Sequence, residues 1–229
     1  MKKRMKKLFL MVTMLVAAVS ANAQLEQGTF SIQPKAGATI SWLSNMPKIG
    51  TGSLSIDKSP TVGAILGAEA EYQLAEKFSV AAGIMYAQQG SGWEDYSVSL
   101  GNDKYELKDA KIELGYVNIP VTANYYLFKG FAVKAGVQFG ILTSAKEKGT
   151  YIIETNGHKT TTDFSGDDFK DHCNKLDISI PLGISYEFNI PIVIDVRYNL
   201  GLMKVFKDEM HLDSKNNVVQ LTVGYKLAL

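Results

Sequence analysis

The amino-acid sequence predicts an all-β fold, an eight-stranded antiparallel up-and-down transmembrane β-barrel. Three observations predict this fold. Residues 1–23 have the form of a cleavable export leader. After the leader, apolar residues recur at every second position in eight segments, which is the period of a two-faced strand. The connections between these segments are alternately short and long, as in barrels that cross a membrane.

The leader has the three parts of a signal peptide. It begins with a basic stretch that contains Lys2, Lys3, Arg4, Lys6 and Lys7. Residues 8–19 are apolar but too few to form a spanning helix. Ala21 and Ala23 fit the small-residue rule for cleavage, so we expect residues 1–23 to be a signal peptide and residues 24–229 to form one outer-membrane barrel domain.

Charge and composition narrow the class of protein. The chain has 24 basic and 23 acidic residues, and the leader removes five basic ones, which leaves 19 against 23 and a net charge of about −4. A mildly acidic chain does not suggest nucleic-acid binding. Cys173 is the only cysteine, so no disulfide can form within the chain. No stretch of 18 residues after the leader lacks a charge, so the chain can cross a membrane only as a closed barrel.

The eight segments are expected near residues 29–41, 61–74, 77–89, 113–127, 131–143, 175–188, 190–201 and 217–228. In chain order, every second residue is apolar over 30–40, 62–72, 78–86, 117–125, 131–141, 176–188, 190–198 and 219–229. No charge falls in any of these sets. A Lys or Arg at mid-membrane on that face would cost about 2–4 kcal/mol, so these sets are assigned to the lipid side.

The connections predict which end of the barrel faces which compartment. Tight turns are expected near 75–76, 129–130 and 189, and long loops over 42–60, 90–112, 144–174 and 202–216. Short turns on the periplasmic side and long loops on the outer side are the usual arrangement. An even number of strands also places both chain ends on the periplasmic side.

Charged residues occupy the opposite face of the predicted strands, which would line the lumen. They are Lys35, Glu69, Glu71, Lys134, Asp177, Glu187, Asp195, Arg197 and Lys226. Buried charges need partners, so we expect an ion-pair network with Arg197 among the carboxylates. The interior of an eight-stranded barrel is only wide enough for side chains. The network is therefore interpreted as a structural polar plug, and a proton or ion path is the alternative.

The long loops hold the remaining candidate residues. Trp93, Tyr96 and Tyr105 in the second loop are candidates for contacts with a partner, and they could equally pack over the barrel mouth. The third loop contains Asp163, Asp167, Asp168, Asp171, His172 and Cys173. Their spacing fits neither a calcium loop nor one tetrahedral zinc site, so a solvated acidic loop with at most one helical turn is expected.

Catalytic motifs are absent from the sequence. It has no phosphate-binding loop, no zinc-protease motif and no nucleophile elbow. The three histidines, His158, His172 and His211, all fall in predicted outer loops, and nothing brings a nucleophile, a base and an orienting group together. We expect no catalytic residues, cofactor or metal.

Several strings, in order, resemble the outer-membrane β-barrel domain family common in Bacteroidetes, often called PorT-like. They are 83–90 (GIMYAQQG), 116–121 (YVNIPV), 135–142 (AGVQFGIL), 195–201 (DVRYNLG) and the closing segment 220–227 (QLTVGYKL). The resemblance implies an eight-stranded barrel that the barrel-assembly machinery inserts into the outer membrane. One family member is associated with secretion of cell-surface proteins. Asn118 stands where an acidic residue is common, which implies a changed lumen network. Leu229 replaces the usual terminal aromatic, which bears on assembly.

The leading hypothesis is therefore a non-enzymatic outer-membrane barrel of a Gram-negative bacterium, with outer loops for binding or for a surface- or secretion-associated assembly role. Its expected partners are outer-membrane lipid, the barrel-assembly machinery during insertion, and a surface or periplasmic protein. Three alternatives stay open: a narrow channel, an outer-membrane enzyme acting on lipid or peptide, and a soluble lipocalin-like barrel. The last predicts an apolar interior and a polar exterior, the reverse of this pattern.

Overall fold

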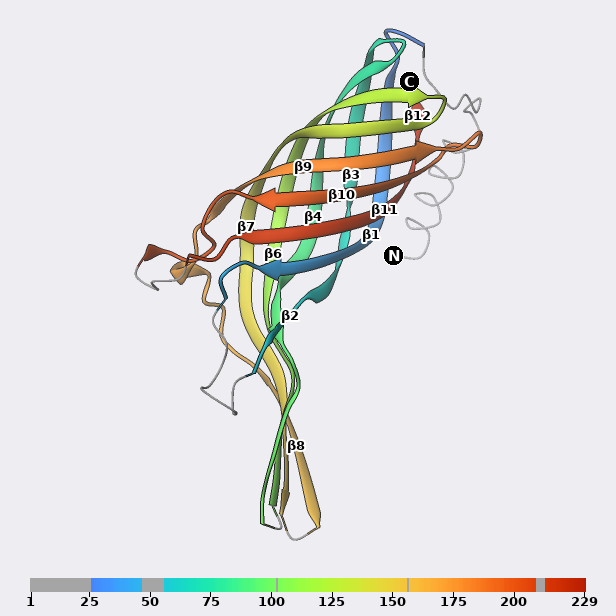
Figure 1. The fold of residues 1–229 in the computed structure, drawn as a ribbon. Coiled ribbons are helices and arrows are strands. Elements are labelled where there is room, and N and C mark those ends of the chain that lie inside the picture. The colour runs from blue at the N-terminus through green and yellow to red at the C-terminus, as the bar shows by residue number, and fades with distance from the viewer. Residues whose placement is uncertain (1–25, 47–55, 102, 156, 209–212) are drawn as a thin grey trace, which may run out of the picture.

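The computed structural model describes residues 26–46, 56–101, 103–155, 157–208 and 213–229. The predicted leader, residues 1–23, lies outside the described residues, as do parts of the first and last predicted loops. Twelve strands and one short 3-10 helix form the described part of the chain (Figure 1). No helix in these ranges is long and apolar enough to cross a membrane.

The elements follow one another as β1 (Phe30–Leu43), β2 (Lys58–Ser59), β3 (Thr61–Ala75), β4 (Phe78–Trp93), β5 (Tyr96–Leu100), β6 (Asp103–Phe128), β7 (Phe131–Thr155), β8 (His158–Ser165), η2 (Lys170–His172), β9 (Leu176–Glu187), β10 (Ile192–Gly201), β11 (Asn216–Tyr225) and β12 (Leu227–Ala228).

Eight of the strands close into a ring. Starting at β1, the hydrogen-bonded neighbours run β3, β4, β6, β7, β9, β10 and β11, and β11 pairs with β1 again. Every pairing is antiparallel, and each ring strand pairs with its neighbour in the chain. The predicted eight-stranded up-and-down barrel is thus confirmed. β12 continues the last strand and pairs with the start of β1.

The backbones of neighbouring strands approach closely at inward-facing glycines. A Cβ atom added to Gly37 would lie 1.9 Å from the carbonyl oxygen of Leu221 on β11. One added to Gly136 would lie 2.0 Å from the carbonyl oxygen of Val121 on β6. Because no real Cβ atom tolerates such contacts, only glycine permits the strands to approach this closely.

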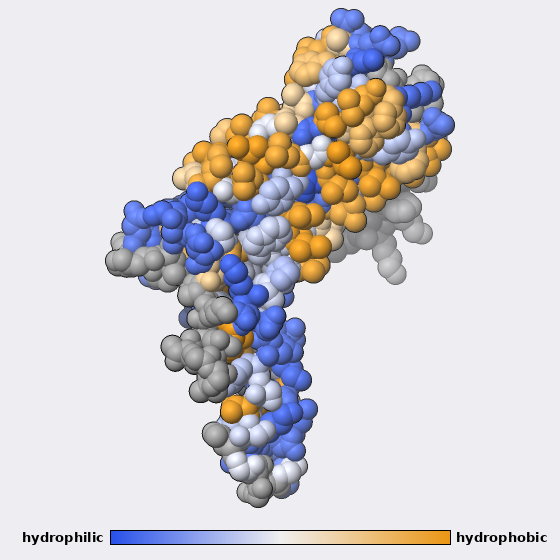
Figure 2. All heavy atoms as spheres, in the orientation of Figure 1, coloured by the Kyte–Doolittle hydropathy of each residue, from blue (hydrophilic) through white to orange (hydrophobic). Residues whose placement is uncertain are grey.

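The two faces of the ring differ as the alternation predicts. Leu66, Ile84 and Leu182 point outward and keep 56%, 64% and 48% of their surface exposed. All nine predicted lumen charges are buried. The exposed apolar side chains gather over the barrel body, where Figure 2 shows a broad hydrophobic surface. This distribution is that of a barrel with lipid outside and a polar interior, and it is opposite to the lipocalin-like alternative.

Two of the predicted loops are largely strand, and the prediction for these segments is wrong. β6 begins at Asp103 rather than near 113, and β7 ends at Thr155 rather than near 143. β5 pairs with β6 and β8 pairs with β7, so the order β5–β6–β7–β8 makes a four-stranded sheet beyond the barrel (Figure 1). We call the described residues of 96–111 and 146–165 the arm. Its strands exist because these backbone groups pair with one another once they leave the ring.

The short connections and the termini lie together. β3 and β4, β6 and β7, and β9 and β10 are joined by the predicted tight turns. Gln73 accepts a backbone hydrogen bond from Gly28, and the backbone N–H of Leu229 donates to Phe30. Both ends of the described chain are therefore at the short-turn end, and the arm extends from the opposite end, which we call the mouth.

Candidate functional site: the barrel lumen and its mouth

Arg197 on β10 lies at the centre of one group of lumen charges. Its guanidinium donates two hydrogen bonds to Glu69 on β3, at 2.5 and 2.7 Å, and two to Asp195, both at 2.8 Å. Lys35 on β1 contacts Glu69 at 2.5 Å and Asp195 at 3.2 Å, and Lys134 on β7 contacts Asp195 at 2.7 Å. Four strands thus contribute to one buried set of charge-assisted hydrogen bonds, which are roughly twice as strong as neutral ones.

Lys226, directly after β11, organises a second group nearer the short-turn end. Its ammonium lies 3.2 Å from a Glu71 oxygen and 2.8 Å from a Glu187 oxygen. Glu71 also accepts hydrogen bonds from Ser79 at 2.5 Å and from the Tyr126 hydroxyl at 2.8 Å. Further donors to its carboxylate are the side chains of Gln33 and Asn124. Each oxygen of this buried carboxylate is therefore satisfied.

Inward glycines leave the space that these long side chains occupy. Gly83 lies opposite Glu69 in the sheet register, and a Cβ atom added there would lie 2.5 Å from Glu69 Cγ. Gly183 lies opposite Arg197, and its Cβ atom would lie 2.8 Å from Arg197 Cγ. The sequence encodes the network as charged residues on one strand facing glycines on the next.

The two groups balance each other in charge. Around Arg197, three cations face two anions, a net charge of +1; around Lys226, one cation faces two anions, a net charge of −1. The structure thus joins eight of the nine predicted charges in a set that is neutral overall. Asp177 is the exception. It lies at the start of β9, toward the mouth, and its Oδ1 has no hydrogen-bond partner among the described residues.

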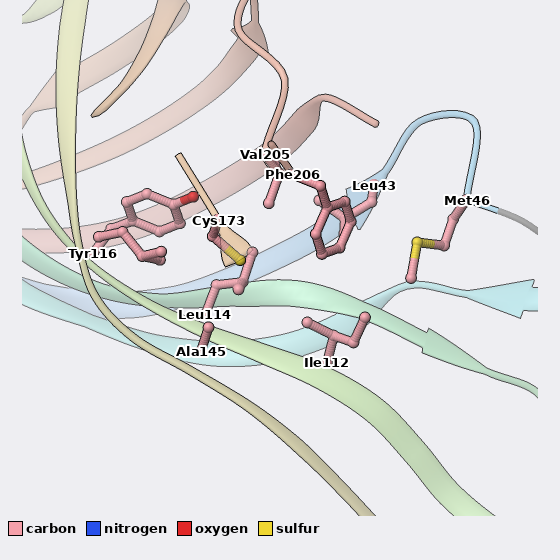
Figure 3. Packing of buried hydrophobic residues seen from close by; sticks show 10 residues of the cluster. Leu43, Met46, Ile112, Leu114, Tyr116, Ala145, Cys173, Val205 and Phe206 are labelled. Atoms are coloured by element: carbon pink, nitrogen blue, oxygen red, sulfur yellow. The ribbon is translucent and has the colours of Figure 1, made fainter. Parts of the chain in front are cut away.

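Apolar side chains replace the charges at the mouth, a feature that the sequence analysis missed. The buried members are Leu43, Met46, Ile112, Leu114, Tyr116, Leu142, Ala145, Cys173, Val205 and Phe206 (Figure 3). Ile112 and Leu114 continue the inward positions of β6 past Tyr116, so a switch from polar to apolar inward residues was the available signal. Phe206 and Met46 come from connections and carry no periodic signal. We call this set the mouth cluster.

A cavity opens beside the mouth cluster. It has a volume of about 360 Å³, and Trp93 at the end of β4 and Phe169 before η2 line it together with members of the cluster. A second hollow of about 460 Å³ is also lined by Trp93 and has a mostly polar lining that includes Asp95, Asp109 and Lys111.

The three predicted contact residues occupy two places. Trp93 packs against the mouth cluster. Tyr96 and Tyr105 instead lie on the arm, on β5 and β6. Tyr105 lies opposite Val98 in the sheet register and opposite Ile153 on β7.

One face of the arm is rich in aromatic and apolar side chains. It carries Tyr96, Val98, Tyr105, Leu107, Tyr151 and Ile153, which are cross-strand neighbours. We call it the aromatic face. Tyr105, Tyr151 and Ile153 keep 38%, 50% and 43% of their surface exposed, and Tyr151 stacks on Phe164 of β8.

The opposite face of the arm is charged. Glu106 forms ion pairs with Lys104 and with Lys108. The hydrogen bond from Lys104 is the main reason why the pKa of Glu106 lies below its usual value. The arm is therefore two-faced, with exposed aromatic and apolar side chains on one side and ion pairs on the other.

The acidic third loop contains one helical turn, η2. Desolvation opposes ionisation of Asp168, but the backbone N–H groups of Lys170 and Ala145 donate to its carboxylate and hold its pKa below the usual value. Cys173 is buried, and its backbone pairs with that of Phe206 in an isolated antiparallel β-bridge. Burial raises the pKa of its thiol to about 11.

The remaining residues of this loop and the histidines are dispersed. Asp163 lies on β8, where it accepts a hydrogen bond from Thr150. His158 begins β8 rather than lying in a loop, His172 ends η2, and His211 lies outside the described residues. Within the described ranges, no three His, Cys, Asp or Glu side chains are grouped as metal ligands would be.

A closed ring of eight antiparallel strands, with an apolar exterior and a charged interior, defines the protein as a transmembrane β-barrel. The profile of the outer membrane protein beta-barrel domain family matches residues 22–207. The chain belongs to this family and is an outer-membrane protein. A comparison with curated proteins gives no match.

Solved structures similar to this chain include two bacterial surface proteins. Ail, the attachment invasion locus protein of Yersinia pestis, is 13% identical, with 87% of this chain and 99% of that chain covered and a TM-score of 0.41. Neisserial surface protein A is 11% identical, with coverages of 86% and 96% and a TM-score of 0.40. A designed transmembrane β-barrel is 10% identical, with coverages of 89% and 98% and a TM-score of 0.36.

Proposed function

We propose that this protein is a non-enzymatic outer-membrane barrel that binds a protein partner through the aromatic face of its arm, in a surface- or secretion-associated assembly role. The observation that carries the proposal is the arm itself. It extends β6 and β7 well beyond the ring and exposes Tyr105, Tyr151 and Ile153 on one face. Tyrosine is enriched at protein interfaces and among the residues that contribute most of the binding energy.

The lumen supports a binding role rather than transport. The eight paired charges fill the half of the lumen near the short turns, and the mouth cluster fills the other end. We infer that this interior is a structural plug. Single-channel recording in planar bilayers should show no large, stable conductance. A steady open current would refute the plug and favour the narrow channel.

Site-specific photo-crosslinking in living cells tests the arm. A photoreactive phenylalanine at Tyr151 lies on the aromatic face, and one at Thr161 on β8 faces the other way, since Thr161 pairs with Ile152. Both positions are exposed, so they are matched for access. The proposal expects a discrete crosslinked protein at Tyr151 and none at Thr161. Equal products at both positions, or none at either, would contradict a face-specific partner.

The route of export, the route of membrane insertion and the bacterial source of the protein are also proposed. The basic stretch, the apolar segment and the small residues Ala21 and Ala23 support export by a leader that is cleaved after Ala23. The resemblance to PorT-like proteins supports insertion by the barrel-assembly machinery and a Bacteroidetes source. Amino-terminal sequencing of the protein from outer-membrane fractions should begin at Gln24. A chain that still carries residues 1–23 in that fraction would overturn the leader assignment.

A further inference from the structure

The cavity at the mouth combines an apolar floor with acidic side chains at its edge. Its floor is made by Met46, Trp93, Ile112, Phe169 and Phe206. Three of these residues, Trp93, Phe169 and Phe206, are aromatic. In another protein, a dry cavity of about 150 Å³ holds a benzene molecule. At about 360 Å³, this cavity has room for one ring with a short chain.

The polar part of the lining is acidic. Glu147, Asp167 and His172 lie there, and the lining contains neither Lys nor Arg. Among the described residues, no ion pair or side-chain hydrogen bond engages Glu147 or Asp167. Of the nearby lysines, Lys148 contacts Glu113 at 2.7 Å, Lys170 lies 3.9 Å from Asp168, and Lys207 donates a hydrogen bond to the backbone carbonyl of Asp171. Lys146, next to Glu147 in the chain, is among the cations that lower the pKa of Asp168. Among the described residues, the site therefore presents two carboxylates without an ion-pair partner, next to aromatic side chains.

We propose that this cavity binds a hydrophobic monocation, an ammonium group carrying an aromatic or short alkyl chain. The apolar part contacts the floor, and burial there follows the ordinary hydrophobic gain with area. The ammonium lies between the Glu147 and Asp167 carboxylates, where charge and the faces of Trp93, Phe169 and Phe206 both attract it. A neutral ligand of the same shape gains only the first of these contributions.

Two features of the chain make the site testable. The chain has two tryptophans, and Trp42 stacks on Tyr198 of β10 with ring centroids 6.0 Å apart. A Trp42→Phe background therefore leaves Trp93 as the only fluorescent indole. Gly166 lines the cavity, and a Cβ atom added to it would meet nothing closer than Glu147 Cβ at 3.6 Å. Gly166→Leu should therefore fill the cavity without disturbing the backbone.

The experiment measures Trp93 fluorescence of the barrel in lipid nanodiscs during titration with 4-phenylbutylammonium. Neutral 4-phenylbutanol serves as the matched probe without charge. Saturable binding of the ammonium is expected, at least tenfold tighter than that of the alcohol. The Glu147→Gln/Asp167→Asn variant should weaken ammonium binding at least tenfold, and Gly166→Leu should abolish it. Glu154→Gln/Asp163→Asn removes the same charge from the arm, away from the lining, and should leave affinity unchanged.

Each contrary outcome has a defined meaning. Equal affinity for ammonium and alcohol, or unchanged affinity in the Glu147/Asp167 variant, would refute a cation site. Unchanged binding in Gly166→Leu would show that the probe partitions into lipid. The heat-dependent shift in electrophoretic mobility shows that each variant is folded, so a loss of binding cannot be confused with misfolding. The result is independent of the crosslinking at Tyr151, because no residue of the aromatic face lines the cavity.

Discussion

Replacement of Glu69 by Gln should destabilise the barrel strongly although it changes almost no volume. The carboxylate of Glu69 accepts two hydrogen bonds from Arg197 and one from Lys35. The amide has one acceptor oxygen, and its NH2 group faces donors. The surrounding group then holds Lys35, Lys134 and Arg197 against Asp195 alone, so its net charge rises from +1 to +2.

The expected loss of unfolding free energy follows from the burial of these residues. All five residues of this group are nearly inaccessible, and removing one partner from a buried ion pair costs about 3–5 kcal/mol. A compensating change should recover much of that loss. In Lys35→Met/Glu69→Gln, a cation leaves with the anion and the net charge of the group returns to +1. We expect the loss of unfolding free energy in the double variant to be smaller than the sum of the two single-variant losses by at least about 1.5 kcal/mol, a coupling in the usual range for contacting residues.

Urea unfolding in detergent, followed by tryptophan fluorescence, gives the four free energies of this cycle. Glu154→Gln on the arm is the control for loss of one carboxylate outside the lumen, and it should change the unfolding free energy by less than about 0.5 kcal/mol. Additive effects of the two lumen substitutions would refute the argument. A Glu69→Gln loss as small as that of the control would show that the network contributes little.

Three other outcomes are expected. Gly37→Ala should destabilise the ring closure by about 1–3 kcal/mol in the same assay, because its Cβ would overlap the neighbouring carbonyl. Gly166→Ala should not, because a Cβ atom there makes only ordinary van der Waals contacts. Leu221→Arg on the lipid face should lower the unfolding free energy by about 2–4 kcal/mol, whereas Leu127→Arg beside a short turn should lower it by about 0–1 kcal/mol. Equal losses would contradict the assignment of the outward face at Leu221 to the membrane core. Burial raises the pKa of the Cys173 thiol to about 11, so only about one thiol in a thousand is ionised at pH 8. Reaction of the thiol with a disulfide reagent, followed by absorbance, should be roughly a hundredfold slower in the folded barrel than in the urea-unfolded chain. Equal rates would contradict the buried position of Cys173.

The ring could be predicted from the sequence because membrane insertion constrains every strand in the same way. Lipid requires an uncharged side chain at each outward position, as at Leu66 and Leu221, and this imposes a period of two along the whole strand. The charges on the other face then had to be inward. Their pairing could be predicted only in outline, since contacts such as Arg197 with Glu69 join strands that are distant in the chain.

The arm and the mouth escaped prediction for different physical reasons. Strand β8, with Thr160, Thr161 and Thr162, carries no apolar alternation, and its strand character comes from pairing with β7. The alternation of Tyr96 with Val98 and of Tyr151 with Ile153 is too short to distinguish a strand from a loop on its own. The mouth cluster depends on Met46 and Phe206, which lie in irregular connections. No periodicity marks a residue whose position is fixed by the return path of a loop.

The distribution of charge separates the structural part of this barrel from the part that can bind. Inside the lumen, each group of charges is saturated by hydrogen bonds, and the opposite net charges of the Arg197 and Lys226 groups cancel. Of the nine lumen charges, only Asp177, which lies toward the mouth, stays outside these two groups. At the mouth, Glu147 and Asp167 lack such partners, and on the arm Tyr151 remains half exposed. In the part of the chain that the structure describes, carboxylates without an ion-pair partner and exposed aromatic side chains thus occur together on the outer side, which is where a partner or ligand gains the most from binding.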